Sequence, residues 1–189
     1  MPDAERLTTV AGEELRREID AFEGVAGKPL FFKSLMLLYA TEWLESTLGD
    51  RAHFVLIRRD PVATARSILK GKREKLAHED AWFSLRPSAY ATLKDLPPVE
   101  QVAAQVKALS DRLDTVRDGE GPGHRHEVSY ESFCADPRGQ VDALLRGIGV
   151  EGVDEVSLPA SFAMRSVPEP GSDAECDALR SLLEGSDGC

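Results

Sequence analysis

Two arginines followed by a serine form the pattern in this sequence with the clearest chemical meaning. Arg58 and Arg59 come directly after the apolar run 54–57, and Ser67 follows Arg59 by eight positions. A guanidinium binds a phosphate through two parallel hydrogen bonds, and a nearby hydroxyl can donate another bond to the same group. The pattern therefore favours an anion site, and a nucleotide phosphate is the anion that suits these residue types.

The residues around this pattern predict a strand that leads into a helix. HFVLIR, residues 53–58, has the length and the branched or aromatic content of a buried strand. Pro61 suits the first position of a helix, and Asp60 can cap that helix. Arg59 would then lie at the carboxyl end of a strand, where ligands bind in parallel α/β sheets, beside the positive end of the helix dipole. Spacing alone leaves an alternative open, in which Arg59 pairs with a carboxylate and Ser67 is merely solvated.

Short apolar runs alternate with helical patterns along the rest of the chain. We expect strands at 30–33, 53–58 and 126–130, and helices over 13–24, 37–48 and 99–116, after Pro61 and Pro137, and near Leu179. Residues 72–98 are expected to be irregular or to form short helices over a site. This alternation predicts an α/β fold, with a parallel sheet that carries helices on both faces.

Length and charge set limits on the protein class. The 189 residues fit one domain, 1–189, with a loop-rich tail at 150–189, and the net charge of −10 disfavours a general nucleic-acid or anionic-membrane surface. An anion site must therefore be local. The three cysteines lack CxxC spacing, and no run approaches the ~20 apolar residues of a membrane span. We expect a cytoplasmic protein without a metal site, a signal peptide or a membrane span.

Four segments, in order, resemble one enzyme family. RDPVATARS, residues 59–67, resembles the 3′-phosphate-binding signature of sulfotransferases that use 3′-phosphoadenosine 5′-phosphosulfate (PAPS). FFKS (31–34), AWFSLRPSAY (81–90) and VSYESFCADPRGQVDALLRGIGV (128–150) are similar to other segments of that family, including its bacterial branch. The similarity covers roughly residues 25–165. It implies a three-layer parallel sheet of the P-loop nucleotide-hydrolase-like type, shortened at its N-terminus.

The resemblance implies roles for individual residues. Arg59 and Ser67 would bind the 3′-phosphate of PAPS or of its product PAP, and Tyr130 would lie beside the adenine. Lys33, at the end of its strand, would face the sulfuryl group as it moves to a hydroxyl or amine acceptor. The residues themselves also allow a solvated Lys33 and a Tyr130 that packs in the core.

The acceptor side of the implied site has weaker candidates. Cytosolic relatives place a histidine two residues after the strand-end lysine, and this chain has Leu35 there. His78 is the remaining candidate for the base, although a solvated loop histidine is the alternative. Trp82, Phe83 and Tyr90 are candidates for lining an acceptor pocket, with half-buried packing as their alternative.

One family feature does not match any segment of this sequence: the first strand with its glycine-containing loop, which holds the 5′-phosphosulfate. We therefore expect either a sulfotransferase that needs this segment, supplied for instance by a partner or by a second copy, or a non-catalytic protein that holds PAP or another anion. A nucleotide-kinase-like phosphotransferase is a third hypothesis. It is disfavoured because Phe32 occupies the position of the second glycine in the P-loop-like stretch 27–34.

Overall fold

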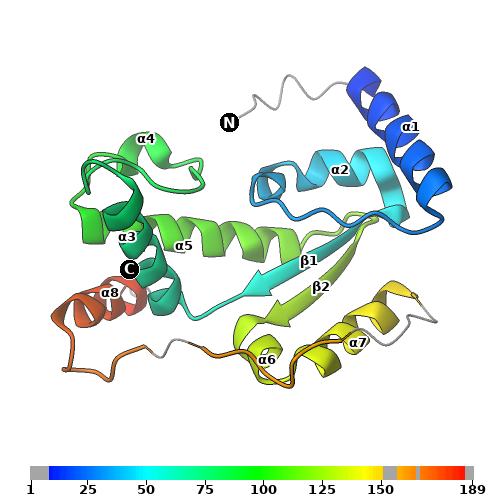
Figure 1. The fold of residues 1–189 in the computed structure, drawn as a ribbon. Helices are drawn as coiled ribbons and strands as arrows, with labels where there is room; N and C mark the ends of the chain where they lie inside the picture. The colour runs from blue at the N-terminus through cyan, green and yellow to red at the C-terminus, as the bar shows by residue number, and fades with distance from the viewer. Residues whose placement is uncertain (1–8, 151–156, 165–166, 186–189) are drawn as a thin grey trace.

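The computed structural model describes residues 9–150, 157–164 and 167–185. Two parallel strands, β1 (His53–Arg58) and β2 (His124–Ser129), form its sheet. His53 is opposite His124 in the register and Arg58 is opposite Ser129, so the carboxyl ends of both strands lie at one edge of the sheet. In Figure 1, α6 (Tyr130–Ala135) and α7 (Pro137–Ile148) lie on one side of the strands, and α2 (Thr41–Leu48) and α5 (Pro98–Arg117) lie on the other.

The remaining elements surround this unit. They are α1 (Thr9–Ala26), the short 3-10 helices η2 (Met36–Tyr39) and η3 (Gly49–Arg51), α3 (Pro61–Lys75), α4 (Tyr90–Leu93) and α8 (Ala174–Glu184). The largest buried cluster lies where α3, α5 and α8 meet (Figure 1), and it consists of Val62, Ala65, Ile68, Leu69, Val102, Ala103, Val106 and Leu179. The helix that carries Ser67 is therefore packed against two others.

The strand–helix unit around Arg59 is confirmed. β1 covers residues 53–58, and α3 begins at Pro61 with the Asp60 carboxylate accepting a hydrogen bond from the Ala63 N–H at 2.6 Å. The predicted long helix after Pro98 is confirmed as α5. The third predicted strand is displaced, since β2 begins at His124 and Tyr130 already belongs to α6.

The predicted strand at 30–33 is wrong. Residues 28–34 are irregular, and Phe31 and Phe32 are 75% and 62% exposed. A strand exists only through pairing, and among the described residues β1 and β2 pair only with each other, so residues 30–33 form no ladder. The sheet of the described residues thus has two strands where the sequence predicted three.

Other boundaries also differ from the predictions. α1 continues through Gly24 to Ala26, and Gly27 follows it with a φ of +60°, a conformation that favours glycine. Phe22 of this helix is 61% exposed. The predicted helix 37–48 is divided into η2 and α2, and residues 76–89 before α4 are irregular with turns, as predicted.

Two further sequence expectations concern cysteines and membranes. Cys134 and Cys176 are buried free thiols, and Cys189 lies outside the described residues. In the ranges that the structure describes, no helix combines the length and the apolar composition needed to cross a membrane.

Candidate functional site

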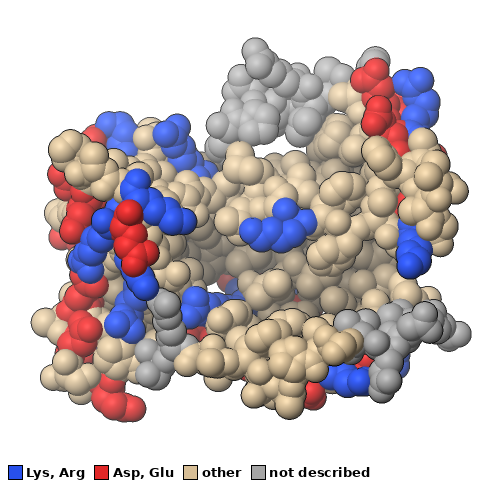
Figure 2. Space-filling model, in the orientation of Figure 1, with Lys and Arg blue, Asp and Glu red and all other residues tan. Residues whose placement is uncertain are grey.

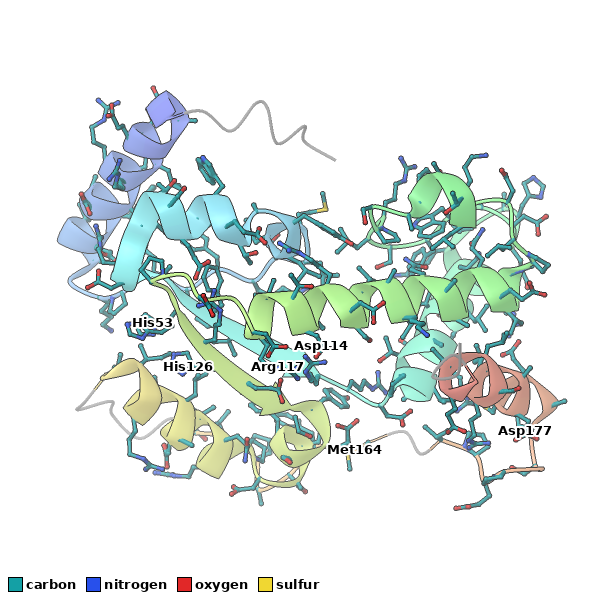
Figure 3. All side chains as sticks on the ribbon, turned by 180° about the vertical axis from the view of Figure 1, so that it is seen from behind. His53, Asp114, Arg117, His126, Met164 and Asp177 are labelled. Carbon is teal, nitrogen blue, oxygen red and sulfur yellow. The ribbon has the colours of Figure 1, made fainter. Side chains whose placement is uncertain are left out.

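Arg58 is held inside the fold by carboxylates. Its Nη2 lies 2.6 Å from Oδ1 of Asp114 on α5, and its Nε lies 2.7 Å from Oε2 of Glu127 on β2. Figure 3 shows Asp114 beside Arg117 near the middle of the molecule. Arg58 therefore connects both strands to α5 and has a structural role.

Arg59 has a different environment. Its guanidinium carbon lies 4.6 Å from the ring centroid of Tyr130, which follows β2 directly, so the two side chains form a cation–π pair across the carboxyl ends of the strands. Among the described residues, no carboxylate lies within the 4.0 Å of an ion pair with Arg59. Because a ring face does not use N–H donors, the guanidinium can still bind an anion.

Ser67 lies two turns into α3. Its side chain is exposed and has no hydrogen-bond partner in the described parts of the chain. The side chain of Asp60 already accepts from the Ala63 N–H at the start of this helix, so part of the helix N-terminus is satisfied internally. The helix end alone therefore offers an anion fewer free N–H groups.

Glu131 is a residue of this region that the sequence reasoning missed. Its Oε1 accepts a hydrogen bond from the backbone N–H of Asp60 at 3.0 Å, and its Oε2 accepts from the Ser129 hydroxyl at 3.1 Å. Burial raises the pKa of Glu131, but these hydrogen bonds and the charge of Arg59 outweigh burial, so the pKa lies below its usual value. The signals in the sequence were its position next to Tyr130 at a strand end and its place in the segment 128–150, which resembles the family.

Lys33 and His78 both lie outside the helices and strands. Lys33 lies exposed on the irregular segment 28–34 and does not end a strand. His78 is exposed in a turn closed by the Ala81 N–H, which donates to the His78 carbonyl at 3.2 Å. Within the described residues, neither side chain forms a hydrogen bond or ion pair with Arg59.

The three aromatic candidates lie on the segment between α3 and α5. The rings of Trp82 and Tyr90 meet edge to face with centroids 4.8 Å apart, and the Arg86 guanidinium lies 4.5 Å from the Tyr90 centroid. Phe83 instead packs on the core and against Gly71 of α3, where its ring leaves no room for a Cβ. The structure thus brings Trp82 and Tyr90 together, whereas Phe83 takes the packing role.

Buried polar side chains fasten this segment to α5. The Gln105 amide donates to the carbonyls of Phe83 and Leu85 at 3.0 and 2.8 Å, and the Gln101 amide donates to that of Lys94 at 2.7 Å. Lys72 of α3, which is 1% exposed, donates to the Gln101 side-chain oxygen. Burial lowers the pKa of Lys72, opposed by the charges of Asp80 and Glu79.

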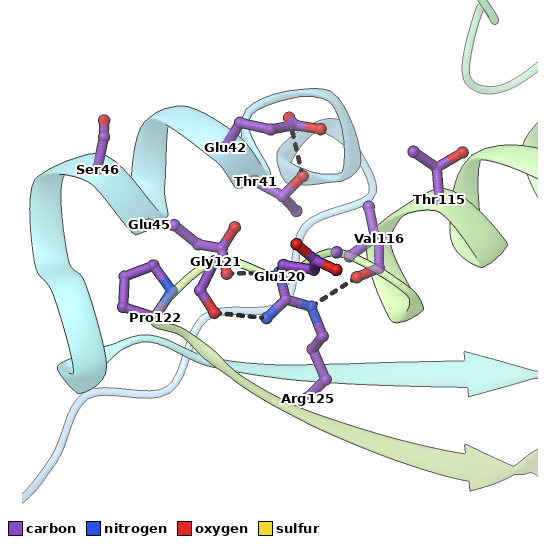
Figure 4. A pocket seen from close by; sticks show the side chains of 11 residues that line it. Thr41, Glu42, Glu45, Ser46, Thr115, Val116, Glu120, Gly121, Pro122 and Arg125 are labelled. Atoms are coloured by element: carbon purple, nitrogen blue, oxygen red, sulfur yellow. Dashed lines mark hydrogen bonds and ion pairs between the residues drawn. The ribbon is translucent and has the colours of Figure 1, made fainter.

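A cavity of about 330 Å³ lies at the opposite end of the strands, between α2 and the turn before β2 (Figure 4). Its lining includes the carboxylates of Glu42, Glu45 and Glu120. Arg125 lies 2.6 Å from Glu45 and donates to the carbonyls of Val116 and Gly121. Because the one guanidinium is already paired and the remaining charges are negative, this cavity does not suit a phosphate.

Charge is distributed unevenly around the molecule. Residues 58–75 contain seven Lys or Arg and two Asp or Glu, although the chain as a whole carries −10. Figure 2 shows charged side chains of both signs gathered over α3, α4 and α8, with a largely uncharged area in the middle of the same face. The segment with Arg59 and Ser67 is therefore rich in basic residues, and in the fold Arg66 and Arg73 of this segment pair with Asp173 and Glu175.

Comparisons with known proteins give one match. The model of a family described as "Sulfotransferase family" matches residues 3–155. No curated protein and no solved structure matches the chain. Among the described residues, no group of three or more His, Cys, Asp or Glu side chains is arranged to hold a metal ion.

Proposed function

The chain belongs to the sulfotransferase family, and from that premise we propose that it binds PAPS and transfers the sulfuryl group to a hydroxyl or amine of a small-molecule or carbohydrate acceptor. The observation that carries the proposal is the Arg59–Tyr130 pair at the carboxyl ends of two parallel strands. A guanidinium without a carboxylate partner suits the 3′-phosphate, and an aromatic ring beside it suits the adenine. The exposed hydroxyl of Ser67 would add a second donor to the phosphate.

The proposed reaction is a single displacement at sulfur. The acceptor oxygen or nitrogen forms a bond to sulfur, the bond from sulfur to the phosphate oxygen breaks, PAP leaves, and a base takes the acceptor proton. Negative charge builds on the oxygens around sulfur as the bonds loosen, so a fixed cation stabilises the transition state. Lys33 is our candidate for that cation and His78 for the base, with Trp82 and Tyr90 beside the acceptor.

The sheet is also part of the proposal. β1 pairs on one side only among the described residues, and Ile57 of β1 is 61% exposed. We propose that β1 and β2 belong to a larger parallel sheet of the nucleotide-hydrolase-like type. A partner or a second copy of the chain would then supply a strand next to β1.

The experiment that tests the site compares two ligands that differ by one phosphate. Calorimetric titration of the chain with PAP and with 5′-AMP should show tighter binding of PAP. Arg59→Ala should weaken PAP binding by about 1.5 to 3 kcal/mol, because a charged hydrogen bond is lost, and leave AMP binding unchanged. Ser67→Ala should act in the same direction, while Arg17→Ala on α1, whose side chain is 77% exposed, serves as a control. Equal affinities for PAP and AMP would contradict the proposed phosphate site.

A second candidate function is PAP binding without transfer. It is favoured by the position of Lys33 on an exposed irregular segment, where it does not end a strand. Incubation of the purified chain with PAPS labelled at the sulfuryl group separates the two functions. Transfer of label to an added acceptor supports the enzyme, whereas binding of PAP with no transfer to phenolic, amine or carbohydrate acceptors supports the binding protein.

A further inference from the structure

Glu131 joins the two strand–helix junctions that carry the proposed donor site. One carboxylate oxygen accepts from the Asp60 N–H at 3.0 Å, at the junction of β1 and α3. The other accepts from the hydroxyl of Ser129 at 3.1 Å, and Ser129 ends β2 and caps α6. Asp60 is the neighbour of Arg59, and Ser129 is the neighbour of Tyr130, so the carboxylate spans the backbone on both sides of the cation–π pair.

The same arrangement leaves Arg59 available. Glu131 uses its two oxygens on an N–H and a hydroxyl, and no ion pair joins it to Arg59 among the described residues. The charge of Glu131 nevertheless attracts Arg59, as the Tyr130 ring also does, because Arg59 contributes to lowering the pKa of Glu131. A carboxylate that bonded the guanidinium directly would compete with an incoming phosphate for the same N–H groups.

We propose that Glu131 is a positioning residue, which holds the strand–helix junctions at Asp60 and Ser129 together and so keeps the Arg59 guanidinium over the Tyr130 ring, ready for the 3′-phosphate. The inference rests on the proposed function for its ligand, but the positioning itself is a property of the free protein. It depends on the reach of the side chain and on its acceptor oxygen. The negative charge is secondary.

Three substitutions separate reach from charge. Glu131→Gln keeps the length and one acceptor oxygen for the Asp60 N–H, and its amide can donate to the Ser129 hydroxyl. Glu131→Asp keeps the charge but is one methylene too short to reach both the Asp60 N–H and the Ser129 hydroxyl. Glu131→Ala removes both properties. Positioning by hydrogen bonds therefore predicts that the glutamine variant resembles the wild type and that the aspartate variant resembles the alanine variant.

The first measurement needs no ligand. The Nε–H proton of Arg59, assigned from its loss in Arg59→Lys, should show an upfield ring-current shift in a ¹H–¹⁵N spectrum, and Tyr130→Leu should abolish that shift. The shift should persist in Glu131→Gln and move toward its Tyr130→Leu value in Glu131→Asp and Glu131→Ala. An Arg59 signal that is the same in all Glu131 variants would overturn the inference.

The second measurement is the dissociation constant for PAP. We expect it to rise about tenfold in Glu131→Ala and Glu131→Asp and to stay within about threefold of the wild type in Glu131→Gln. The matched control is Asp136→Ala, which removes another carboxylate that accepts from a backbone N–H, that of Gly139 in the first turn of α7 at 2.9 Å. This control should lower thermal stability similarly and leave PAP binding unchanged. A wild-type chain that does not bind PAP would refute the proposed function, while the Arg59 spectrum would still decide the role of Glu131.

Discussion

The guanidinium groups of Arg58 and Arg59 are adjacent in the chain but have partners of different kinds. Arg58 lies between the carboxylates of Asp114 and Glu127, at 2.6 and 2.7 Å, and Arg59 lies over the ring of Tyr130. One residue therefore joins the strands to α5, and its neighbour keeps its hydrogen-bond donors. This division between adjacent arginines produces opposite expectations for the two alanine variants.

Arg58→Ala should lower the free energy of unfolding by about 1 to 2 kcal/mol, because it removes two partly exposed ion pairs. Arg59→Ala should change it by less than about 0.5 kcal/mol, since a surface substitution without a carboxylate partner has little effect. Urea unfolding measures both. A larger loss of stability in Arg59→Ala than in Arg58→Ala would contradict the structural role of Arg58.

The histidines at the start of the strands should make stability depend on pH. His53 Nδ1 lies 3.0 Å from His126 Nε2, and the rings of His53 and His124 stack with centroids 4.6 Å apart (Figure 3 shows His53 and His126). Burial, followed by the neighbouring imidazoles, lowers the pKa of His53, and burial and His124 lower that of His126. On α7, Gly147 is the neighbour of His126.

Protonation of these histidines favours the unfolded chain. Unfolded histidines take up protons near pH 6.5, whereas His53 and His126 do so only at lower pH in the folded protein. The free energy of unfolding should therefore fall as the pH drops through about 6.5 and level off below the folded pKa values. Urea midpoints at pH 7.5 and 5.5 measure this change. His53→Phe should reduce it, and His78→Ala, in an exposed turn, should not.

Lys72→Ala should be strongly destabilising, although lysine usually lies on the exposed surface of a helix. Lys72 is 1% exposed and is a hydrogen-bond donor to the Gln101 oxygen, so its removal leaves an unsatisfied acceptor and unfilled space. We expect a loss of about 2 to 4 kcal/mol. Lys70→Ala on the same helix is the control, because the Lys70 side chain is 49% exposed and its ammonium lies 3.4 Å from Glu74 on the same helix. Similar thermal unfolding of both variants would argue against the buried position of Lys72.

The Glu45–Arg125 pair beside the cavity should contribute more stability than the neighbouring Glu42–Arg112 pair. The side chains of Glu45 and Arg125 are 9% and 14% exposed, whereas those of Glu42 and Arg112 are 64% and 17% exposed, and Arg112 also donates to the Leu38 carbonyl and the Thr41 hydroxyl. Glu45→Ala leaves a buried guanidinium without its charge partner and should cost about 3 kcal/mol. Glu42→Ala, one turn earlier on α2, should cost less than about 1 kcal/mol. Chemical denaturation of the two variants gives the comparison directly.

The sequence predicted the parts of the fold whose local signals agree with their tertiary environment. β1, the Asp60 cap and α5 follow directly from apolar periodicity and capping residues. The error at 30–33 has a different origin, since FFKS has the composition of a strand but strand formation depends on a neighbour elsewhere in the chain. A short apolar run does not indicate whether a distant segment will pair with it.

The candidate site was predictable to a similar extent. Arg59 and Tyr130 were chosen from spacing and resemblance, and the structure places them in contact. Glu131 was missed because a carboxylate that accepts from a backbone N–H has no spacing rule in the sequence. Lys72 did have a signal, since it follows the buried Ile68 by four positions on one helix face, but a lysine is normally assigned to solvent.

The core of the fold depends on α8, although this helix lies outside the residues that the family model matches. Leu179 and Cys176 of this helix are fully buried, and both lie beyond residue 155, where the family match ends. A fragment that ends at residue 155 would therefore expose the apolar surfaces of α3 and α5 that α8 covers. One of these helices, α3, carries Ser67. A fragment designed for expression should therefore include the eleven residues of α8.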